Sequence, residues 1–546
     1  MERIVARIAM HTDYLFGVGG ANIEDLYDAV QRAETSITGI VAKHEFGAAT
    51  MADGYARATN RLGVVAATSG GGALNLIAAL GESFDSRVPL LALVGQPPIL
   101  LEGRGAFQDT SGGPGRLDAE RVFGAVSKYC VKLTRAEDVD AVLDQAVTAA
   151  LSGGPAVVLL PKDVQQSSVP VSVPAVADVV EAAHPGVVAS SRLADAADLV
   201  SAGRGPVVII AGPEVARQDA RAELKVFADA VDAAVVVTPG AKDAFPNRHP
   251  RFAGVTGVMG HPHVPDLIGG ARLCVLAGAS MSMTDRVGLD DALTSCSRVL
   301  HIGVEPPFVR AHARLSGALG RTLLDLAALT AGVVEPQLMQ RKDLHKLIVP
   351  PAAGPGVRYR DAVTVLAAHL ERGADVIADA GNTGAAVVHH LPIPDNGRFL
   401  IALGMGGMGY AFGAGIGSAL GRGRRTFVIA GDGAYFMHGH EVHTAVEYQV
   451  PVTFVVFNNN AHAMCVTREQ LFYSGDYTFN RFGQAHIGAA VAAMFPHLPA
   501  YSTATVDEFD TALDDSRDAS GPVFIELICD PDEIPPFTTF LKELSA

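Results

Sequence analysis

Short apolar runs, rich in Val, Ile and Leu and bounded by Gly or Pro, recur along the chain and alternate with stretches of helical periodicity. Such runs are typical of strands that are buried on both faces of a parallel sheet and joined by helices. The pattern therefore predicts an α/β fold of doubly wound parallel sheets. Because the chain has 546 residues and a domain holds roughly 150, we expect more than one such sheet.

The expected strands fall into three groups. They lie at 14–17, 63–67, 89–94 and 156–160, then at 206–210, 234–237, 273–276 and 299–302, and finally at 375–378, 426–429, 452–457 and 523–528. Two bridges that contain Pro, Gln165–His184 and Ile348–Gly356, separate the groups. We therefore predict three domains of similar size, at residues 1–165, 186–335 and 356–546.

The composition excludes several classes of protein. Lys and Arg number 42 against 58 Asp and Glu, giving a net charge of −16, so there is no basic surface for nucleic acid or an anionic membrane. Hydrophobic residues make up 49% of the chain and charged residues 18%, which is typical of a folded protein. The five cysteines are far apart, without metal-ligand or disulfide spacing, and the start of the sequence lacks a signal-peptide pattern, so we expect a cytoplasmic protein.

One segment, Phe399–Gly421, runs for 23 residues without a charge, which is long enough to span a membrane. Eight of these residues are Gly, and the segment leads directly into an expected strand. We therefore predict a Gly-rich loop that enters a buried helix, and no membrane span.

Polar residues follow two strands of the third group. Gly431–Gly433 (GDG) follows one strand and, 27 residues later, Asn458–Asn460 follows another. The carboxyl ends of parallel strands meet at the sheet edge where such folds bind ligands. A carboxylate, an amide oxygen and a backbone carbonyl are hard ligands that suit Mg²⁺ or Ca²⁺ holding a diphosphate. Alone, GDG would equally fit a tight turn; the pair predicts a metal site.

This pairing resembles the thiamine-diphosphate (ThDP)-dependent enzymes, whose metal motif joins GDG to a later Asn-Asn. Further segments resemble the acetolactate synthase branch of that superfamily over nearly the whole chain. These segments are LFGVGGANIEDLYDAV (15–30), HEFGAATMADGYAR (44–57), TSGGGALN (68–75), AFQ (106–108), GPAVVLLPKDV (154–164) and GMGGMGY (404–410). The resemblance implies an N-terminal pyrimidine-binding domain, a central nucleotide-binding-like domain and a C-terminal diphosphate-binding domain.

The resemblance also implies roles for single residues. Glu45 would hydrogen-bond the aminopyrimidine ring and help to remove the thiazolium C2 proton, although a carboxylate in a first helical turn is also favoured by the helix dipole. Asp432, the Asn459 side chain and the Ala461 carbonyl would bind Mg²⁺. Met408, which on sequence alone would be core filler, would support the bent form of the cofactor.

The other implied contacts are less specific. The cofactor would touch Asn75, Asn382, Thr383, Gly406, Gly433, Ala434 and His462, and the loop at 379–384 would cradle the diphosphate. The substrate pocket would include Gly20, Phe107, Gln108, Met464, Cys465 and Arg468. Arg468 stands where the branch has Trp, and the chain has no Trp at all. It is either a solvated helix charge or a clamp on an anionic acceptor.

The implied function is that of a lyase or transferase that uses ThDP and Mg²⁺. It would decarboxylate a 2-oxo acid, a small-molecule substrate, and transfer the acyl unit to an acceptor, as an acetolactate synthase-like carboligase does. Two alternatives are a decarboxylase without ligation and a flavin-linked 2-oxo acid oxidase. An alternative of another class is a non-catalytic nucleotide-binding homologue.

The central domain leaves its ligand open. Thr284–Val287 and Gly240–Gly254 resemble segments of the branch that binds FAD, whereas Ala211–Pro213 replaces a run of Gly. FAD, another adenine nucleotide and no ligand all fit these residues.

The implied site is divided between two domains, because Glu45 lies in the first and Asp432 in the third. The resemblance implies that the two come from different subunits. We therefore expect a homodimer or homotetramer with active sites at the subunit interface, and neither nucleic acid nor a membrane as partner.

Overall fold

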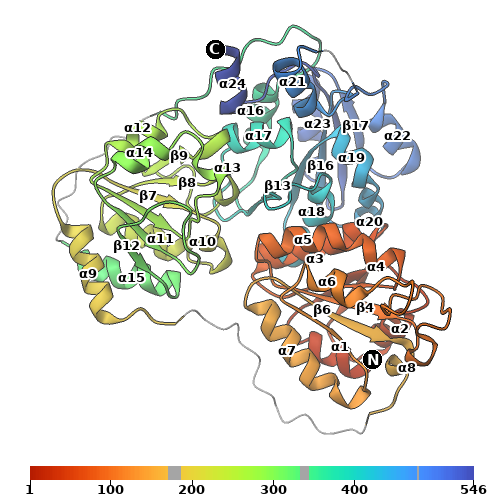
Figure 1. The fold of residues 1–546 in the computed structure, drawn as a ribbon. Helices are drawn as coiled ribbons and strands as arrows, with labels where there is room; N and C mark the ends of the chain where they lie inside the picture. Colours follow the sequence, from red (N-terminus) through yellow and green to blue (C-terminus); the bar gives the residue numbers. More distant parts are fainter. Residues whose placement is uncertain (170–185, 333–342, 476–478, 546) are drawn as a thin grey trace.

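The computed structural model describes residues 1–169, 186–332, 343–475 and 479–545. These residues form three six-stranded sheets, one for each group of predicted strands, and helices cover the sheets (Figure 1). All paired strands run parallel. The predicted α/β fold of three parallel-sheet domains is confirmed.

The first sheet has the strand order β2-β1-β3-β4-β6-β5. Its strands are β1 (Tyr14–Gly17), β2 (Thr38–Val41), β3 (Gly63–Ala67), β4 (Leu90–Gln96), β5 (Tyr129–Lys132) and β6 (Pro155–Pro161). The helices are α1 (Glu2–Ile8), α2 (Glu24–Arg32), α3 (Glu45–Thr59), α4 (Gly71–Asn75), α5 (Ile77–Asp85), α6 (Ala119–Gly124), α7 (Val139–Leu151) and α8 (Lys162–Gln165).

The central sheet has the order β12-β11-β10-β7-β8-β9. Its strands are β7 (Val207–Ala211), β8 (Ala234–Val237), β9 (Phe252–Val255), β10 (Leu273–Ala277), β11 (Val299–Ile302) and β12 (Ala313–Leu315). The helices are α9 (Ser190–Ser201), α10 (Glu214–Arg217), α11 (Arg221–Ala230), α12 (Val264–Gly269), α13 (Met283–Arg286), α14 (Asp290–Ser295) and α15 (Leu319–Thr330).

The third sheet has the order β14-β13-β15-β16-β18-β17. Its strands are β13 (Asp375–Ala378), β14 (Phe399–Ile401), β15 (Thr426–Gly431), β16 (Val452–Asn458), β17 (Ala500–Thr503) and β18 (Val523–Ile528). The helices are α16 (Tyr359–His369), α17 (Asn382–His390), α18 (Tyr410–Arg422), α19 (Asp432–His438), α20 (Val442–Glu447), α21 (Ala463–Phe472), α22 (Ile487–Met494), α23 (Val506–Asp515) and α24 (Thr538–Ser545).

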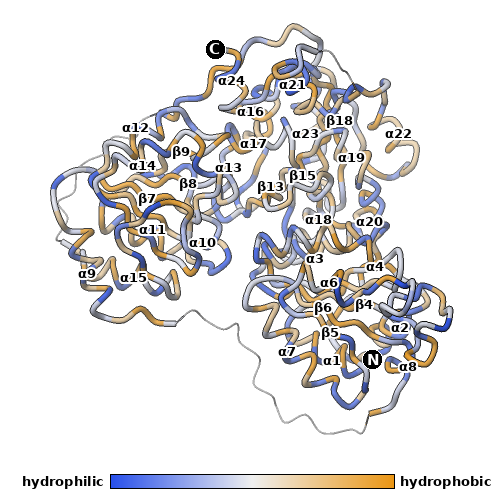
Figure 2. The backbone as a smooth tube through the Cα atoms, in the orientation of Figure 1, coloured by the Kyte–Doolittle hydropathy of each residue, from blue (hydrophilic) through white to orange (hydrophobic). Residues whose placement is uncertain are grey.

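The predicted strands are all present, with ends that differ from the prediction by two residues at most. The strands that the sequence did not predict are β2, β5, β9, β12, β14 and β17, the two edge strands of each sheet. Figure 2 shows hydrophobic segments running through the strands inside each domain. The continuous apolar runs therefore marked the inner strands, which are buried on both faces.

The uncharged segment at 399–421 is folded as predicted. It forms the short strand β14, a loop and most of the 13-residue helix α18. Among the described helices, none combines the length and the apolar character that a bilayer crossing needs.

The predicted bridges between domains are only partly described. Residues 170–185 of the first bridge and the expected end of the central domain at 335 lie outside the described residues, and 348–356 contains neither helix nor strand. The domain bounds at 165, 186, 335 and 356 stay predictions.

The first and third domains meet through α3 and α18. An ideal Cβ at Gly54 would lie 2.2 Å from the Ala414 carbonyl oxygen, and one at Gly417 would lie 1.9 Å from the Met51 carbonyl oxygen. The two helix backbones therefore touch, and only glycine fits between them at these positions.

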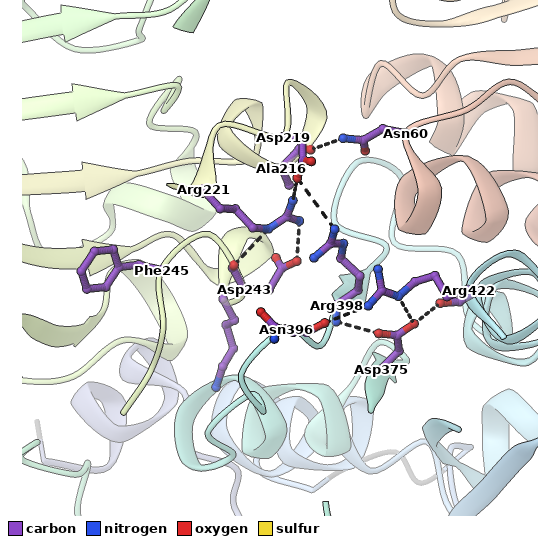
Figure 3. Close-up of polar contacts among 12 residues, drawn as sticks. Asn60, Ala216, Asp219, Arg221, Asp243, Phe245, Asp375, Asn396, Arg398 and Arg422 are labelled. Carbon is purple, nitrogen blue, oxygen red and sulfur yellow. Dashed lines mark hydrogen bonds and ion pairs between the residues drawn. The ribbon is translucent and has the colours of Figure 1, made fainter. Parts of the chain in front are cut away.

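The central domain contacts both other domains through polar side chains (Figure 3). The Asn60 amide of the first domain donates to the Ala216 carbonyl at 3.1 Å. Arg398 of the third domain lies 3.8 Å from the Asp219 carboxylate of the central domain. These contacts place the central domain beside the pair that α3 and α18 join (Figure 1).

We predict that Gly417→Ala destabilises the protein although it raises the intrinsic helix propensity of α18. The added methyl group must push α18 away from Met51, at a cost of about 1–3 kcal/mol. The measurement is the thermal midpoint of unfolding. The matched control is Gly124→Ala in α6, where an added Cβ meets nothing within 4 Å. Equal midpoints for Gly417→Ala and the parent would contradict the packing argument.

Candidate functional site

The carboxyl edge of the third sheet brings the GDG and Asn segments together. Strands β15 and β16 are neighbours, and Gly431 pairs with Phe457 in their register. Asp432 therefore leaves the sheet at the same level as Asn458, one residue before Asn459. This register brings the GDG and Asn segments close together at the carboxyl edge, as predicted from the sequence.

Two side-chain oxygens converge at this edge. Asp432 Oδ2 and Asn459 Oδ1 both accept a hydrogen bond from the Ala461 N–H, each at 3.1 Å. Asp432 is only 1% exposed, and burial raises the pKa of its carboxyl to about 7 although backbone N–H groups oppose the shift. Burying an ionised carboxylate is costly unless a positive charge lies next to it. A hard cation such as Mg²⁺ fits this pair of oxygens.

The described residues contain no group of three or more His, Cys, Asp and Glu side chains arranged to hold a metal. Within these parts of the chain, the carboxylate, amide and carbonyl oxygens near Asp432 are therefore not rivalled by a metal site built from several His, Cys, Asp or Glu side chains.

Gly433 lies at the centre of this edge. An ideal Cβ there would lie 2.5 Å from His462 Nδ1 and 3.1 Å from Met408 Cε. The structure thus brings Met408, Gly433 and His462 together, with the buried Ala434 next in α19.

Two buried polar atoms near this edge have no hydrogen-bond partner among the described residues: His462 Nδ1 and Asn382 Oδ1. Asn382 begins α17 after β13, the neighbour of β15, and Thr383 Oγ1 would lie 3.7 Å from a Cβ on Gly431. Buried polar atoms are usually paired. A polar ligand bound at this edge would give both atoms a hydrogen-bond partner.

Asp379 fixes the loop that carries Met408. Its carboxylate accepts from the N–H groups of Gly409 (3.0 Å) and Ala411 (2.9 Å), and burial raises its pKa to about 6. The loop also contains Gly406, whose φ of +66° favours glycine and whose Cβ position faces open space. The Asp379 side chain therefore positions a neighbouring loop, within a segment that we predicted as a diphosphate cradle.

A pocket of about 400 Å³ opens beside Gly433, and its lining includes Phe436, Met437, His462 and Phe482. The rings of His462 and Phe482 meet edge to face with centroids 4.6 Å apart. The side chains that line the pocket are apolar apart from the imidazole.

Glu45 stands in the first domain at the start of α3, 8% exposed. Its Oε2 accepts a hydrogen bond of 2.9 Å from the Asn75 amide, and Oε1 would lie 2.7 Å from a Cβ on Gly72. The turn at 68–75 therefore holds Glu45.

The third domain holds the start of the same helix. The buried Glu441 accepts from the backbone N–H groups of Lys43 and His44, and an ideal Cβ at Gly47 would lie 2.1 Å from its Oε1. Burial raises the pKa of Glu441. Glu441 could not be predicted from the sequence, because its partners lie almost 400 residues earlier in the chain.

The predicted substrate-pocket residues lie in two places. In the first domain, Gln108 accepts from the Ser69 hydroxyl at 3.2 Å, Gly20 packs against Thr68, and Phe107 is 76% exposed.

The other three lie on α21. Met464 is partly buried and Cys465 is exposed. The Arg468 guanidinium lies 5.7 Å from the centre of the Phe472 ring, a cation–π contact with its own helix. This contact fits a helix-surface charge.

Two further residues support the edge. The Asn459 amide donates to the Tyr359 hydroxyl at 3.0 Å, and the Tyr359 N–H donates to the Glu533 carboxylate at 3.1 Å, whose pKa burial raises to about 7. Neither residue carries a sequence signal. Asp379 does carry one, because it directly follows a strand as Asp432 does.

The loop after β7 is where a central sheet of this kind would bind a nucleotide. The Gly212 N–H donates to the Ala277 carbonyl and the Glu214 N–H to the Gly278 carbonyl, while Pro213 has no N–H. The Glu214 carboxylate, whose pKa burial raises, accepts from the Val304 N–H at 3.0 Å. In doubly wound folds this first loop offers its N–H groups to a diphosphate. Here these donors are used and a carboxyl group occupies the edge, so the loop after β7 offers no free N–H group to the diphosphate of FAD.

Three regions of the chain match families of thiamine pyrophosphate enzymes, thiamine pyrophosphate being another name for ThDP. Residues 2–113 match the N-terminal TPP binding domain, residues 193–325 the central domain and residues 379–527 the C-terminal TPP binding domain.

Curated relatives match over most of the chain. A probable acetolactate synthase large subunit from Methanocaldococcus jannaschii is 28% identical, with 96% of this chain and 90% of the relative covered. The acetolactate synthase isozyme 1 large subunit from Escherichia coli is also 28% identical, with 84% and 81% covered.

Solved structures share the fold. A structure from Mycobacterium smegmatis, described as a thiamin diphosphate-dependent enzyme, has a TM-score of 0.79 at 22% identity. The thiamine diphosphate-dependent 4-hydroxybenzoylformate decarboxylase of Rhodococcus jostii has a TM-score of 0.78 at 20% identity. Each comparison covers 97% of this chain and 98% of the other.

Proposed function

We propose that this chain, which belongs to the ThDP-dependent enzyme superfamily in its acetolactate synthase-like branch, decarboxylates a 2-oxo acid and transfers the acyl unit to an acceptor. The observation that carries the proposal is the convergence of the Asp432 and Asn459 oxygens beside Gly433. A buried, converging carboxylate and amide suit Mg²⁺, and Mg²⁺ suits a diphosphate.

The residues present fit ThDP and Mg²⁺. Asp432, Asn459 and the Ala461 carbonyl would hold the metal, and backbone N–H groups of Asn382, Thr383 and Ala434 would hold the diphosphate. The Gly433 N–H donates to Asp432 Oδ1 at 2.9 Å, and the missing side chain of Gly433 would leave room for the cofactor. Met408 and His462 would contact the ring system. When bound, ThDP supplies a carbanion at C2 and an electron sink for the loss of CO₂.

Glu45 would bind the aminopyrimidine ring and exchange a proton with it. Its oxygens are fixed by Asn75 and by the packing of Gly72, so that the carboxyl group is oriented before the cofactor arrives. Such preorganisation is what general acid–base catalysis requires.

We further propose that the two halves of the site come from two subunits. Glu45 is hydrogen-bonded within its own domain, whereas Met408 and His462 gather at the third sheet. Apolar side chains near both halves are exposed in the single chain, with Leu100 and Phe107 each at 76% and Phe436 at 51%. Exposed apolar surface of this kind is typical of an interface. A closed two-fold dimer, or a dimer of dimers, would cover it.

We predict CO₂ release from a 2-oxo acid without flavin. Carboligation is the favoured outcome because the curated relatives are acetolactate synthase large subunits. The test is a panel of 2-oxo acids scored for CO₂ and for ligated product, with and without an aldehyde acceptor. Flavin content of the same preparation, measured at 450 nm, should be near zero because the loop after β7 has no free donors.

Release of CO₂ with an aldehyde as sole product would assign a simple decarboxylase instead. No turnover of any 2-oxo acid by protein that holds ThDP and Mg²⁺ would contradict the proposed function, and stoichiometric FAD would contradict the flavin-free central domain.

We predict that Asp432→Ala abolishes Mg²⁺-dependent binding of ThDP. Loss of a charged metal ligand should weaken binding by roughly 100-fold or more, since even the partners of metal ligands are worth about 10–100-fold. The measurement is calorimetric titration of ThDP with and without a chelator. The exposed Asp395 of the same domain supplies the control, Asp395→Ala, which should behave as the parent. Unchanged ThDP affinity in Asp432→Ala would place the diphosphate elsewhere.

We predict that Glu45→Gln keeps cofactor affinity within about tenfold but slows proton exchange at C2 by about 100-fold or more, which is the scale of general acid–base catalysis. Hydrogen–deuterium exchange at C2 of the bound cofactor measures this rate. Glu34→Gln, at an exposed position, is the control. Exchange in Glu45→Gln as fast as in the parent would remove Glu45 from the mechanism.

A further inference from the structure

A second pocket, of about 250 Å³, lies at the opposite edge of the third sheet, where β13 and β15 begin. Four arginines from three segments line it: Arg372 before β13, Arg424 and Arg425 before β15, and Arg517 after α23. His369 and Glu371 also belong to the lining. These residues could not be predicted as a group from the sequence, because they are scattered over almost 150 positions.

The lining carries more positive charge than its neighbours neutralise. Arg517 pairs with Asp514 at 2.6 Å, and His369 contacts Asp510 at 2.7 Å. Within the described parts of the chain, no carboxylate makes an ion pair with Arg372, Arg424 or Arg425. Glu371 is the only acid among the pocket-lining residues. With His369 neutral, the four arginines face Glu371, Asp510 and Asp514, so a surplus of about one positive charge remains.

Arg425 forms the inner wall of the pocket. Its guanidinium donates to the carbonyl of Gly521 at 2.9 Å and to that of Ala519. Carbonyl oxygens satisfy its N–H groups but do not cancel its charge, and burial lowers the pKa of the guanidinium. A partly buried cation of this kind is stabilised by an anion.

Gly373 leaves space for the Arg424 guanidinium at the rim of the pocket. An ideal Cβ at Gly373 would lie 2.9 Å from Arg424 Nη1, and Gly373 has a φ of +87°. Any other residue at 373 would adopt a strained backbone and displace the guanidinium. The local chain therefore places Arg424 beside Arg425 over the pocket.

We propose that this pocket binds a phosphate group. Guanidinium groups match phosphate oxygens in charge and in their forked geometry. The net charge of the chain is −16, so that its average surface repels anions and a local positive surplus stands out. At about 30 Å³ per water molecule, the 250 Å³ of the pocket accommodate a phosphate with a small substituent. The phosphate group in this pocket would belong either to free phosphate or to a small phosphate monoester.

This pocket is separate from the candidate active site. Strand β15 has six residues, so its two ends lie about 20 Å apart at roughly 3.3 Å per residue. The strands that begin at the pocket, β13 and β15, are followed at their other ends by Asp379 and Asp432. The inference does not rest on the proposed function.

The test is calorimetric titration with inorganic phosphate of the full chain saturated with ThDP and Mg²⁺, so that the catalytic edge is filled. We expect saturable binding, and a Kd that rises by about tenfold or more in the double variant Arg372→Ala/Arg424→Ala, which loses two charged donors. Arg121→Ala, whose side chain is 88% exposed in the first domain, removes a charge elsewhere and should leave the Kd unchanged. Glycerol 3-phosphate in place of phosphate distinguishes the two sources, because tighter binding favours a monoester.

Non-saturable heats, or equal weakening by Arg121→Ala, would overturn the proposal in favour of general charge screening. If the protein fails to take up ThDP, phosphate can also enter the catalytic edge. In that case, phosphate binding with the same Kd in the parent and in the double variant would be binding at the catalytic edge and would overturn the proposal. A fraction of the binding that is lost in the double variant would support the proposal even without ThDP.

Discussion

The backbone contact between α3 and α18 determines where the functional residues of the molecule can lie. Gly413 lies against Thr50, Gly417 against Met51 and Gly421 against Thr59, so the two helices run in the same direction and begin at the same end. At that end, α3 starts with Glu45 and α18 starts two residues after Met408. Glu441 adds a polar tie by accepting from the N–H groups of Lys43 and His44. One chain therefore holds Glu45 and the loop that carries Met408 in a fixed relation.

The inner strands could be predicted from the sequence because burial on both faces leaves a continuous apolar run. All five residues of β3 are buried, and all seven of β4. The edge strands lack that signature. In β5 each residue is half-buried, and in β2 only one of four residues is buried, while β14 has only three residues. An edge strand is defined by its neighbour in the sheet, which the local sequence does not record.

The candidate site shows the same division. Asp432 and Asn459 could be predicted because both follow strands that are adjacent in the sheet, so that strand order alone brings them together. The resemblance to ThDP enzymes supplied Glu45 and Met408. Glu441, Tyr359 and the arginines of the second pocket could not be found, since their contacts join elements that only the packing of domains or the return of the chain places side by side.

The claim on which the proposed mechanism depends is that two subunits complete each site, and mixing two inactive variants measures it most directly. Glu45→Gln chains and Asp432→Ala chains, mixed under conditions of subunit exchange confirmed by mass, form hybrids with one intact site and one doubly altered site. Activity should return to about a quarter of the parent level, because half of the dimers are hybrids and each has one working site of two. Activity that stays at the level of the single variants after complete exchange, or a fully active monomer in sedimentation, would contradict the shared site.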